Sequence, residues 1–210
     1  MNELATRTVV GLILVAIAIA IAWVGGYPFA LFVAALSTAV YWEWMQLAKD
    51  RSILWKIGGF FYCLVPAIAL LWLRDRTLDG FGFIMWVFIV TWATDIGGYA
   101  IGKTMGRTKL APAISPNKTI EGLIGGMVFA ALFGGAWAWA AQLPHGLYML
   151  APFAAIAAQV GDLFESAMKR RAGVKDSGRW LPGHGGLFDR LDGLLVVATI
   201  TGALVYAGWL

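Results

Sequence analysis

Residues 166–192 of this chain read S-A-M-K-R-R-A-G-V-K-D-S-G-R-W-L-P-G-H-G-G-L-F-D-R-L-D, a dense polar segment in an otherwise apolar sequence. The segment carries six lysines and arginines, three aspartates and one of the two histidines of the 210 residues. Apolar runs long enough to cross a bilayer lie on either side of it. A charged, glycine-rich segment is costly in such a position, so we expect it to bind a charged ligand.

The composition points to a membrane protein. The chain is 60% hydrophobic and only 13% charged, with a mean hydropathy of +0.74. A soluble domain of this size needs more polar surface to cover its core. The single cysteine, Cys63, lies in an apolar run, which excludes a disulfide framework and a cysteine metal site.

Apolar runs predict an all-α, polytopic membrane protein with about seven transmembrane helices and cytoplasmic polar loops. A helix needs roughly 20 apolar residues to cross the hydrocarbon layer. The first run is long and others follow closely, so we interpret it as a retained span rather than a signal peptide. We expect N-terminal transmembrane helices over residues 1–80 and a catalytic transmembrane region over residues 81–210. The predicted spans are Thr8–Val24, Pro28–Leu47, Ile57–Leu73, Phe81–Ile101, Ile120–Ala141, Leu147–Met168 and Leu191–Leu210.

The distribution of lysine and arginine predicts the orientation. With the N-terminus in the cytoplasm, fourteen of the sixteen basic residues fall on the cytoplasmic side, and only Arg74 and Arg76 fall outside. The polar loops 102–119 and 169–190 then lie on the same side of the membrane and can meet. This topology also accounts for the net charge of +4, so we expect no nucleic-acid partner.

Several acids lie inside the predicted helices, where a carboxylate is costly unless it faces a partner, water or an ion. Asp162 and Glu165 share one helical face with Lys169, and Ser166 lies on the same face. An ion pair between helices is the alternative interpretation of this face. Glu43 stands between two tryptophans and matches no motif, so for this acid we favour the ion pair.

Two motifs precede the polar segment. The sequence G-G-Y-A-I-G-K-T, residues 97–104, matches the phosphate-binding P-loop pattern, but we reject that interpretation because a membrane span leads into it instead of a strand. The sequence S-P-N-K-T-I-E-G, residues 115–122, predicts a turn that caps the next helix. Lys118 and Thr119 would then lie at a helix N-terminus that can bind an anion, or serve as ordinary capping residues.

The polar segment itself has the composition of a phosphate and metal site. Its G-H-G-G run, residues 183–186, lets the backbone approach a ligand closely, and a proline fixes the entry to that run. Asp189 and Asp192 share a face at the start of the last helix. Carboxylates among many cations suit Mg²⁺ whose remaining positions are filled by phosphate oxygens. Anchoring to anionic headgroups would explain the cations but not the acids or the glycines.

Residues 166–192 resemble the signature of the phosphatidate cytidylyltransferases, also called CDP-diglyceride synthases. The resemblance continues through residues 161–166, 94–99 and 115–122, and covers roughly residues 90–200. The N-terminal spans match those of the family only in being apolar. We expect this chain to lack one or two N-terminal spans that many bacterial members have. The resemblance implies an enzyme of the cytoplasmic (inner) membrane that converts phosphatidate and CTP to CDP-diacylglycerol and pyrophosphate, requires Mg²⁺ and forms homodimers.

The resemblance also assigns roles to residues. In the family, the aspartates matching Asp162 and Asp189 serve a metal centre in a membrane cavity that opens to the cytoplasm. The resemblance implies that this centre holds Mg²⁺, and a second metal ion is possible there. We therefore expect in-line attack by the lipid phosphate on the α-phosphorus of CTP, catalysed by positioning and charge neutralisation. The predicted catalytic residues are Asp162, Asp189, Lys169, Arg170, Lys175 and Arg190. The predicted substrate-binding residues are Asp95, Ser115, Asn117, Lys118, Thr119, Ser166, Asp176, His184, Gly185, Gly186 and Asp192.

Two other classes of function remain open at this point. An ion-coupled transporter could use the intramembrane Asp95 and Asp162, but such proteins commonly show repeat symmetry, and the sequence shows none. Another lipid nucleotidyl- or phosphotransferase, such as a lipid-alcohol kinase, is the second alternative. The D-G-x2-A-R spacing of the CDP-alcohol phosphotransferases is absent from the sequence.

Overall fold

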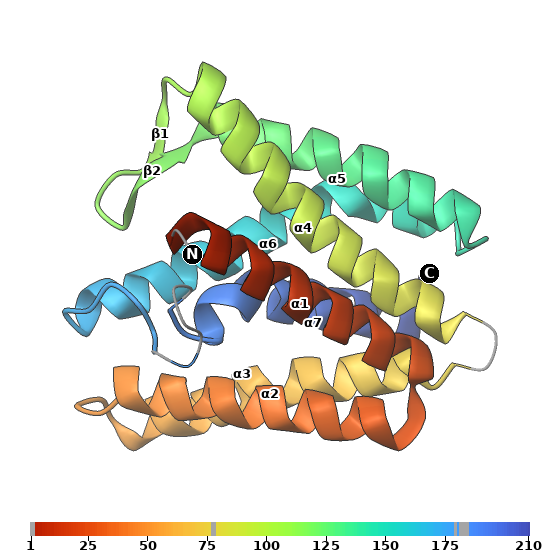
Figure 1. Cartoon of the computed structure of the whole chain (residues 1–210), viewed down its shortest axis with the longest axis horizontal. Coiled ribbons are helices and arrows are strands. Elements are labelled where there is room, and N and C mark those ends of the chain that lie inside the picture. Colours follow the sequence, from red (N-terminus) through yellow and green to blue (C-terminus); the bar gives the residue numbers. More distant parts are fainter. Residues whose placement is uncertain (1–2, 77–78, 179, 181–184) are drawn as a thin grey trace.

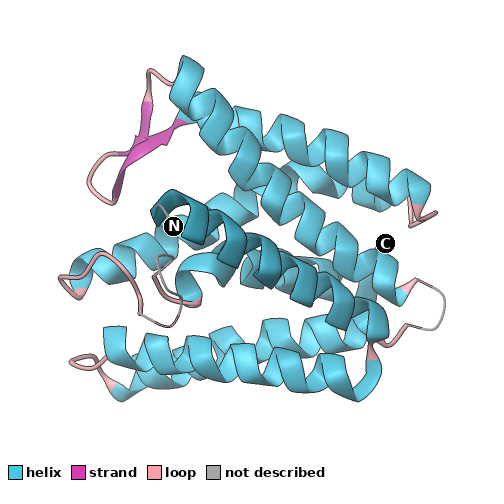
Figure 2. Ribbon diagram, viewed as in Figure 1, coloured by secondary structure: helices cyan, strands magenta, loops and turns pink. Residues whose placement is uncertain are grey.

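The computed structural model describes residues 3–76, 79–178, 180 and 185–210, and these form seven helices and one β-hairpin (Figure 1). Figure 2 shows how completely helices dominate the described residues. The elements are α1 (Glu3–Val24), α2 (Gly26–Leu47), α3 (Ile53–Arg74), α4 (Gly80–Met105), β1 (Lys109–Ala111), β2 (Ser115–Thr119), α5 (Ile120–Ala140), α6 (Gly146–Arg171) and α7 (Phe188–Tyr206).

Each predicted apolar run forms a helix, because only a helix pairs all of its own backbone groups in an apolar surrounding. The P-loop-like residues 97–104 lie inside α4, so they form no phosphate-binding loop. Among the described residues, α3, α4, α5 and α6 are long and apolar enough to cross a membrane. The described apolar part of α1, Thr8–Val24, is shorter, and α7 carries three charged residues in its first turns. The count of seven spans therefore stays a prediction.

The loop between α4 and α5 contains a small antiparallel sheet that the helical prediction omitted. Lys109 of β1 pairs with Thr119 of β2, and Ala111 pairs with Ser115. Strands this short leave little alternation in the sequence to detect. Thr119 then caps α5, since its hydroxyl accepts the N–H of Gly122 at 3.1 Å, as the capping interpretation predicted.

Helix α4 is the most central element, since it pairs along its length with α5 and also contacts α1, α3, α6 and α7. Helix α5 lies against α4 and α6, while α3 packs on α7 and carries α2 on its other side. Helix α1 crosses the front of the molecule over α7 (Figure 1). The core includes Trp86 and Phe83 of α4, Phe29 of α2 and Leu147 of α6, all nearly inaccessible to solvent.

The polar loops gather at one end of the helix bundle. The hairpin, the α2–α3 loop and the α6–α7 connection lie at the left of Figure 1, whereas the α3–α4 and α5–α6 connections lie at the right. Arg170, near the end of α6, donates from Nε to the carbonyl of Ile114 in the hairpin at 3.3 Å. The two polar loops therefore meet, as the sequence predicted.

Candidate active site

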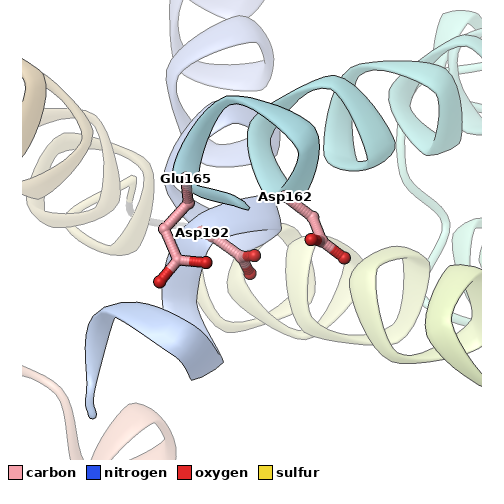
Figure 3. Close-up of side chains that lie close together, drawn as sticks. All are labelled: Asp162, Glu165 and Asp192. Atoms are coloured by element: carbon pink, nitrogen blue, oxygen red, sulfur yellow. The ribbon is translucent and has the colours of Figure 1, made fainter. Parts of the chain in front are cut away.

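Three carboxylates converge between α6 and α7. Asp162 and Glu165 of α6 and Asp192 of α7 each offer one oxygen, and these oxygens lie within 4.8 Å of one another. Figure 3 shows the three side chains projecting into the same space. The helices approach closely here because Gly161 has no side chain, and a Cβ at that position would lie 2.7 Å from the carbonyl oxygen of Asp192. We call Asp162, Glu165 and Asp192 the acidic cluster.

Strand β2 brings a cation to the acidic cluster. Nζ of Lys118 lies 2.5 Å from Oδ2 of Asp162 and donates to Oε1 of Gln159 at 2.8 Å. The hydroxyl of Ser166 donates to the other oxygen of Asp162 at 3.2 Å. The structure thus joins Lys118, from the 115–122 motif, to Asp162 and Ser166, which the sequence placed together on one helical face. It adds Gln159, which no motif indicated.

A buried lysine connects the cluster to Asp189. Lys169 is 8% exposed, and its Nζ lies 2.5 Å from Oε2 of Glu165 and 2.5 Å from Oδ1 of Asp189. Burying an ammonium is costly unless it is paired, and two carboxylates satisfy that requirement. The two predicted metal ligands, Asp162 and Asp189, are therefore linked through Glu165 and Lys169.

Asp189 is held by its own loop. Its Oδ2 accepts the N–H groups of Ser177 and Gly186, both at 2.9 Å. Asp189 lies in the first turn of α7, ahead of the apolar run. Burial disfavours its charged form, but the Lys169 ammonium and the two N–H donors outweigh burial and hold the pKa of Asp189 below its ordinary value.

Glu43 of α2 reaches the same loop from far away in the sequence. It is 1% exposed and accepts the N–H of Leu187 at 3.0 Å, the N–H of Phe188 at 2.8 Å and the hydroxyl of Ser177 at 2.8 Å. Among the described residues its partners are backbone N–H groups and a hydroxyl, so the expected ion pair between helices stays a prediction. The one signal in the sequence was an acid inside an apolar run.

The glycines of the polar segment allow close packing around these acids. Gly185 has φ +80°, and a Cβ there would lie 3.0 Å from Oδ2 of Asp189. A Cβ on Gly186 would collide with the hydroxyl of Ser177 and would lie 2.5 Å from Oε2 of Glu43. Within this chain, the glycines serve the approach of the loop to Asp189 and Glu43.

Other predicted residues lie around this centre. Arg170 is exposed and also donates to the carbonyl of Val174 at 3.1 Å. Lys175 and Asp176 are exposed in the α6–α7 connection, and Asn117 is exposed on β2 beside the half-buried Ser115. The predicted substrate-binding residue His184 lies outside the described residues.

An apolar cavity of about 440 Å³ borders the centre. Its walls come from α1, α2, α3, α4 and α7 and include Phe29, Phe88 and Trp92. Its charged lining consists of Asp95 of α4 and of Asp189, Arg190 and Asp192 in the first turns of α7. A cavity of this size with apolar walls and a few charged groups suits part of an amphiphilic ligand.

Comparison with known proteins identifies the family. The model described as "Cytidylyltransferase family" matches residues 5–75 and 51–207, so the similarity includes the N-terminal helices that the motifs left uncovered. The phosphatidate cytidylyltransferase of Brucella suis biovar 1 (strain 1330) is 37% identical over an alignment of 250 positions, covering 95% of this chain and 92% of the relative. That of Bacillus subtilis (strain 168) is 47% identical over 127 residues, covering 58% of this chain and 47% of the relative. That of Staphylococcus aureus (strain COL) is 39% identical over 151 residues, covering 69% and 58%. This chain therefore belongs to the phosphatidate cytidylyltransferase family.

Proposed function

We propose that this protein transfers the cytidylyl group of CTP to phosphatidate, giving CDP-diacylglycerol and pyrophosphate. One observation carries the proposal: carboxylates of α6 and α7, the buried Lys169 of α6 and the half-buried Lys118 of β2 converge beside an apolar cavity. This place lies at the end of the bundle where the polar loops meet. The reaction joins a lipid anion to a water-soluble polyanion, so it requires such a border between apolar and charged surroundings.

The lipid substrate fits the cavity by its chemistry. Apolar side chains of α1–α4 and α7 would contact the acyl chains close to the headgroup, while Arg190 is the cation of the cavity lining that can meet the phosphate. The exposed cations Arg170 and Lys175 lie toward the hairpin side, where CTP would enter from water.

The acidic cluster fits a divalent metal ion. Three carboxylates offer the hard oxygen donors that Mg²⁺ prefers. Oε1 of Glu165 is buried without a hydrogen-bond partner among the described residues, as is the hydroxyl of Tyr62, which lies within electrostatic range of Asp192 and Glu165. Asp162, Glu165 and Asp192 would hold the ion, with Asp189 as the further predicted ligand. A bound Mg²⁺ would neutralise charge on the phosphates, and a second ion remains part of the proposal.

The protein residues have a limited task in the chemistry. A phosphate oxygen of phosphatidate attacks the α-phosphorus of CTP, the new P–O bond forms, and the bond to the bridging oxygen of the leaving pyrophosphate breaks. The nucleophile is already charged and needs no general base, so positioning and charge neutralisation supply the rate. Lys118 and Lys169 are held by carboxylates for this role, and Arg170, Lys175 and Arg190 would orient the outer phosphates.

The proposal includes the membrane arrangement. Residues 81–210 carry the chemistry within an inner-membrane protein whose N-terminus and polar loops face the cytoplasm. The bias of basic residues and the common end of the polar loops support this orientation. A homodimer follows from the resemblance alone.

The test is the formation of CDP-diacylglycerol from CTP, phosphatidate and Mg²⁺ by the purified protein in detergent. Asp162→Asn and Asp189→Asn should each lower kcat/KM by about 100-fold or more, because each removes a charge beside the reacting phosphates. Asp75→Asn, at the opposite end of the molecule, is the matched control and should act like wild type. Activity within a few-fold of wild type in both site variants would overturn the metal assignment, and no activity in the wild type would overturn the function.

A further inference from the structure

Glu43 is an acid of the N-terminal helices whose hydrogen-bond partners among the described residues belong to the C-terminal polar segment. It lies outside residues 166–192 and outside the motif-bearing residues 90–200. Its carboxylate nevertheless contacts Ser177, Leu187 and Phe188, which follow it by 134 to 145 residues. A buried carboxylate is retained at considerable cost, which these three donors offset.

Two of the donors show that Glu43 caps α7. The first N–H groups of a helix have no partner within that helix and carry partial positive charge. Helix α7 starts at Phe188, and its own N-cap residue, Leu187, supplies no side-chain hydrogen bond. Glu43 therefore provides from α2 the acceptor that the α7 sequence lacks.

The third donor connects Glu43 to Asp189. The Ser177 hydroxyl lies 2.8 Å from Oε2 of Glu43 and 3.0 Å from Oδ2 of Asp189, and the Ser177 N–H donates to that same oxygen of Asp189. The hydroxyl has one proton, which it donates to Glu43 in the shorter of the two contacts. Fixing Ser177 therefore fixes the position of the N–H that Asp189 accepts. Asp189 then presents its other oxygen to Lys169.

Two glycines let the loop pack closely around the carboxylate. A Cβ on Gly178 would collide with Oε1 of Glu43, and a Cβ on Gly186 would approach Oε2. The neighbouring Trp44 holds α2 in place, since its ring packs on Phe188 and Phe164 at centroid distances of 5.9 and 5.8 Å.

We infer that Glu43 is a positioning residue for the proposed reaction: through Ser177 and the first turn of α7 it sets the position of Asp189 at the metal and phosphate site. It acts through the residues that it holds. The expected effect of Glu43 on the reaction rate rests on the proposed function. The expected effect of Glu43 on the position of Asp189 does not.

The first test needs no substrate and no metal. Glu43→Gln keeps the size of the side chain but replaces one acceptor oxygen by a donor, while Ser177→Ala removes the link to Asp189. Both variants should speed tryptic cleavage after Lys175 by about fivefold or more, because the connection opens locally when its anchor weakens. Asp50→Asn, an exposed acid just after α2, makes the same charge change and should be cleaved like wild type.

The second test separates positioning from a loss of folded protein. Glu43→Gln and Ser177→Ala should raise the Mg²⁺ concentration that gives half-maximal activity several-fold, and the double variant should add little to either one. A smaller folded fraction would lower the maximal rate without moving this concentration. The inference would be overturned if both variants were cleaved like wild type and showed the wild-type Mg²⁺ dependence. It would also be overturned if the variants showed a lower maximal rate and no other change. If the wild type made no CDP-diacylglycerol, the proposed function would fail while the cleavage test still decided the role of Glu43.

Discussion

Lys118 joins two parts of the chain that no local pattern connects. It extends from β2 to Asp162 and Gln159 of α6, more than forty residues later. The side chain is mostly buried, with 17% exposure against 32% for Asp162, so the pair is only partly screened by water. The hairpin thereby places a cation where negative charge would build up during phosphate transfer.

Removing this cation should slow the reaction more than it destabilises the protein. Lys118→Met should lower kcat/KM by about 100-fold, because a charge aimed at the phosphates is lost. Stability should fall by about 1–2 kcal/mol, because the pair with Asp162 is neither fully exposed nor fully buried. Steady-state kinetics and thermal unfolding in detergent measure the two effects. Lys109→Met, an exposed lysine of β1, is the control, and equal losses in both variants would contradict this role for Lys118.

At the scale of secondary structure, α4 and α5 are in contact backbone to backbone. A Cβ on Gly97 would lie 2.6 Å from the carbonyl oxygen of Gly125, and one on Gly122 would lie 2.8 Å from that of Gly98. Small residues allow membrane helices to pack this closely when no solvent drives them together. The contact fixes the start of α5, and therefore Lys118 just before it, relative to Asp95 of α4.

A methyl group in this contact should destabilise the protein. Gly125→Ala would place its Cβ 2.5 Å from that of Ile101 and 2.8 Å from the carbonyl oxygen of Gly97, so the helices must separate. We expect a loss of about 1–3 kcal/mol, the usual cost of overpacking. Thermal unfolding in detergent should show a lower midpoint. Gly58→Ala, at an exposed position of α3, is the control: its Cβ would meet no atom within 4 Å, so the change should be neutral or stabilising. Equal unfolding midpoints for the two variants would argue against the tight contact between α4 and α5.

For the whole molecule, the decisive feature is that chemically active loops gather at one end. The hairpin and the α6–α7 connection meet there, and the α3–α4 connection lies at the other end (Figure 1). If this end faces the cytoplasm, CTP arrives from water while phosphatidate arrives within the membrane.

Cysteine labelling can test that orientation. In a Cys63→Ala background, Lys109→Cys and Lys175→Cys should react with a membrane-impermeant maleimide in inverted membrane vesicles but not in intact spheroplasts. Asp75→Cys should show the opposite pattern, because basic residues favour the cytoplasmic side and its loop lies at the far end. Labelling of Lys109→Cys and Lys175→Cys from opposite faces would refute the arrangement.

Sequence reasoning located the helices better than it located their contacts. Apolar runs specify helices locally, which is why all the predicted runs were found as helices. The grouping of Asp162, Ser166 and Lys169 also followed, because helical spacing places them on one face. Spacing cannot show which distant group meets that face. The contact of Gln159 with Lys118 and the place of Asp192 in the acidic cluster therefore emerged only from packing.

Glu43 and Asp189 also show which contacts a sequence cannot predict. The partners of Glu43 are mostly backbone N–H groups, which every residue possesses, so no residue pattern announces them. Asp189 was recognisable as functional by its motif, but its hydrogen bonds to Ser177 and Gly186 depend on the path of the loop.

The walls of the apolar cavity come from α1, α2 and α3 as well as from α4 and α7, whereas β2, α6 and the start of α7 carry the acids and lysines. Under the proposed function, contacts to fatty tails and contacts to phosphate groups would thus fall largely on separate stretches of polypeptide. Evolution can then adapt the tail-contacting surfaces to a thinner, stiffer or more unsaturated bilayer while the nucleotide chemistry stays unchanged.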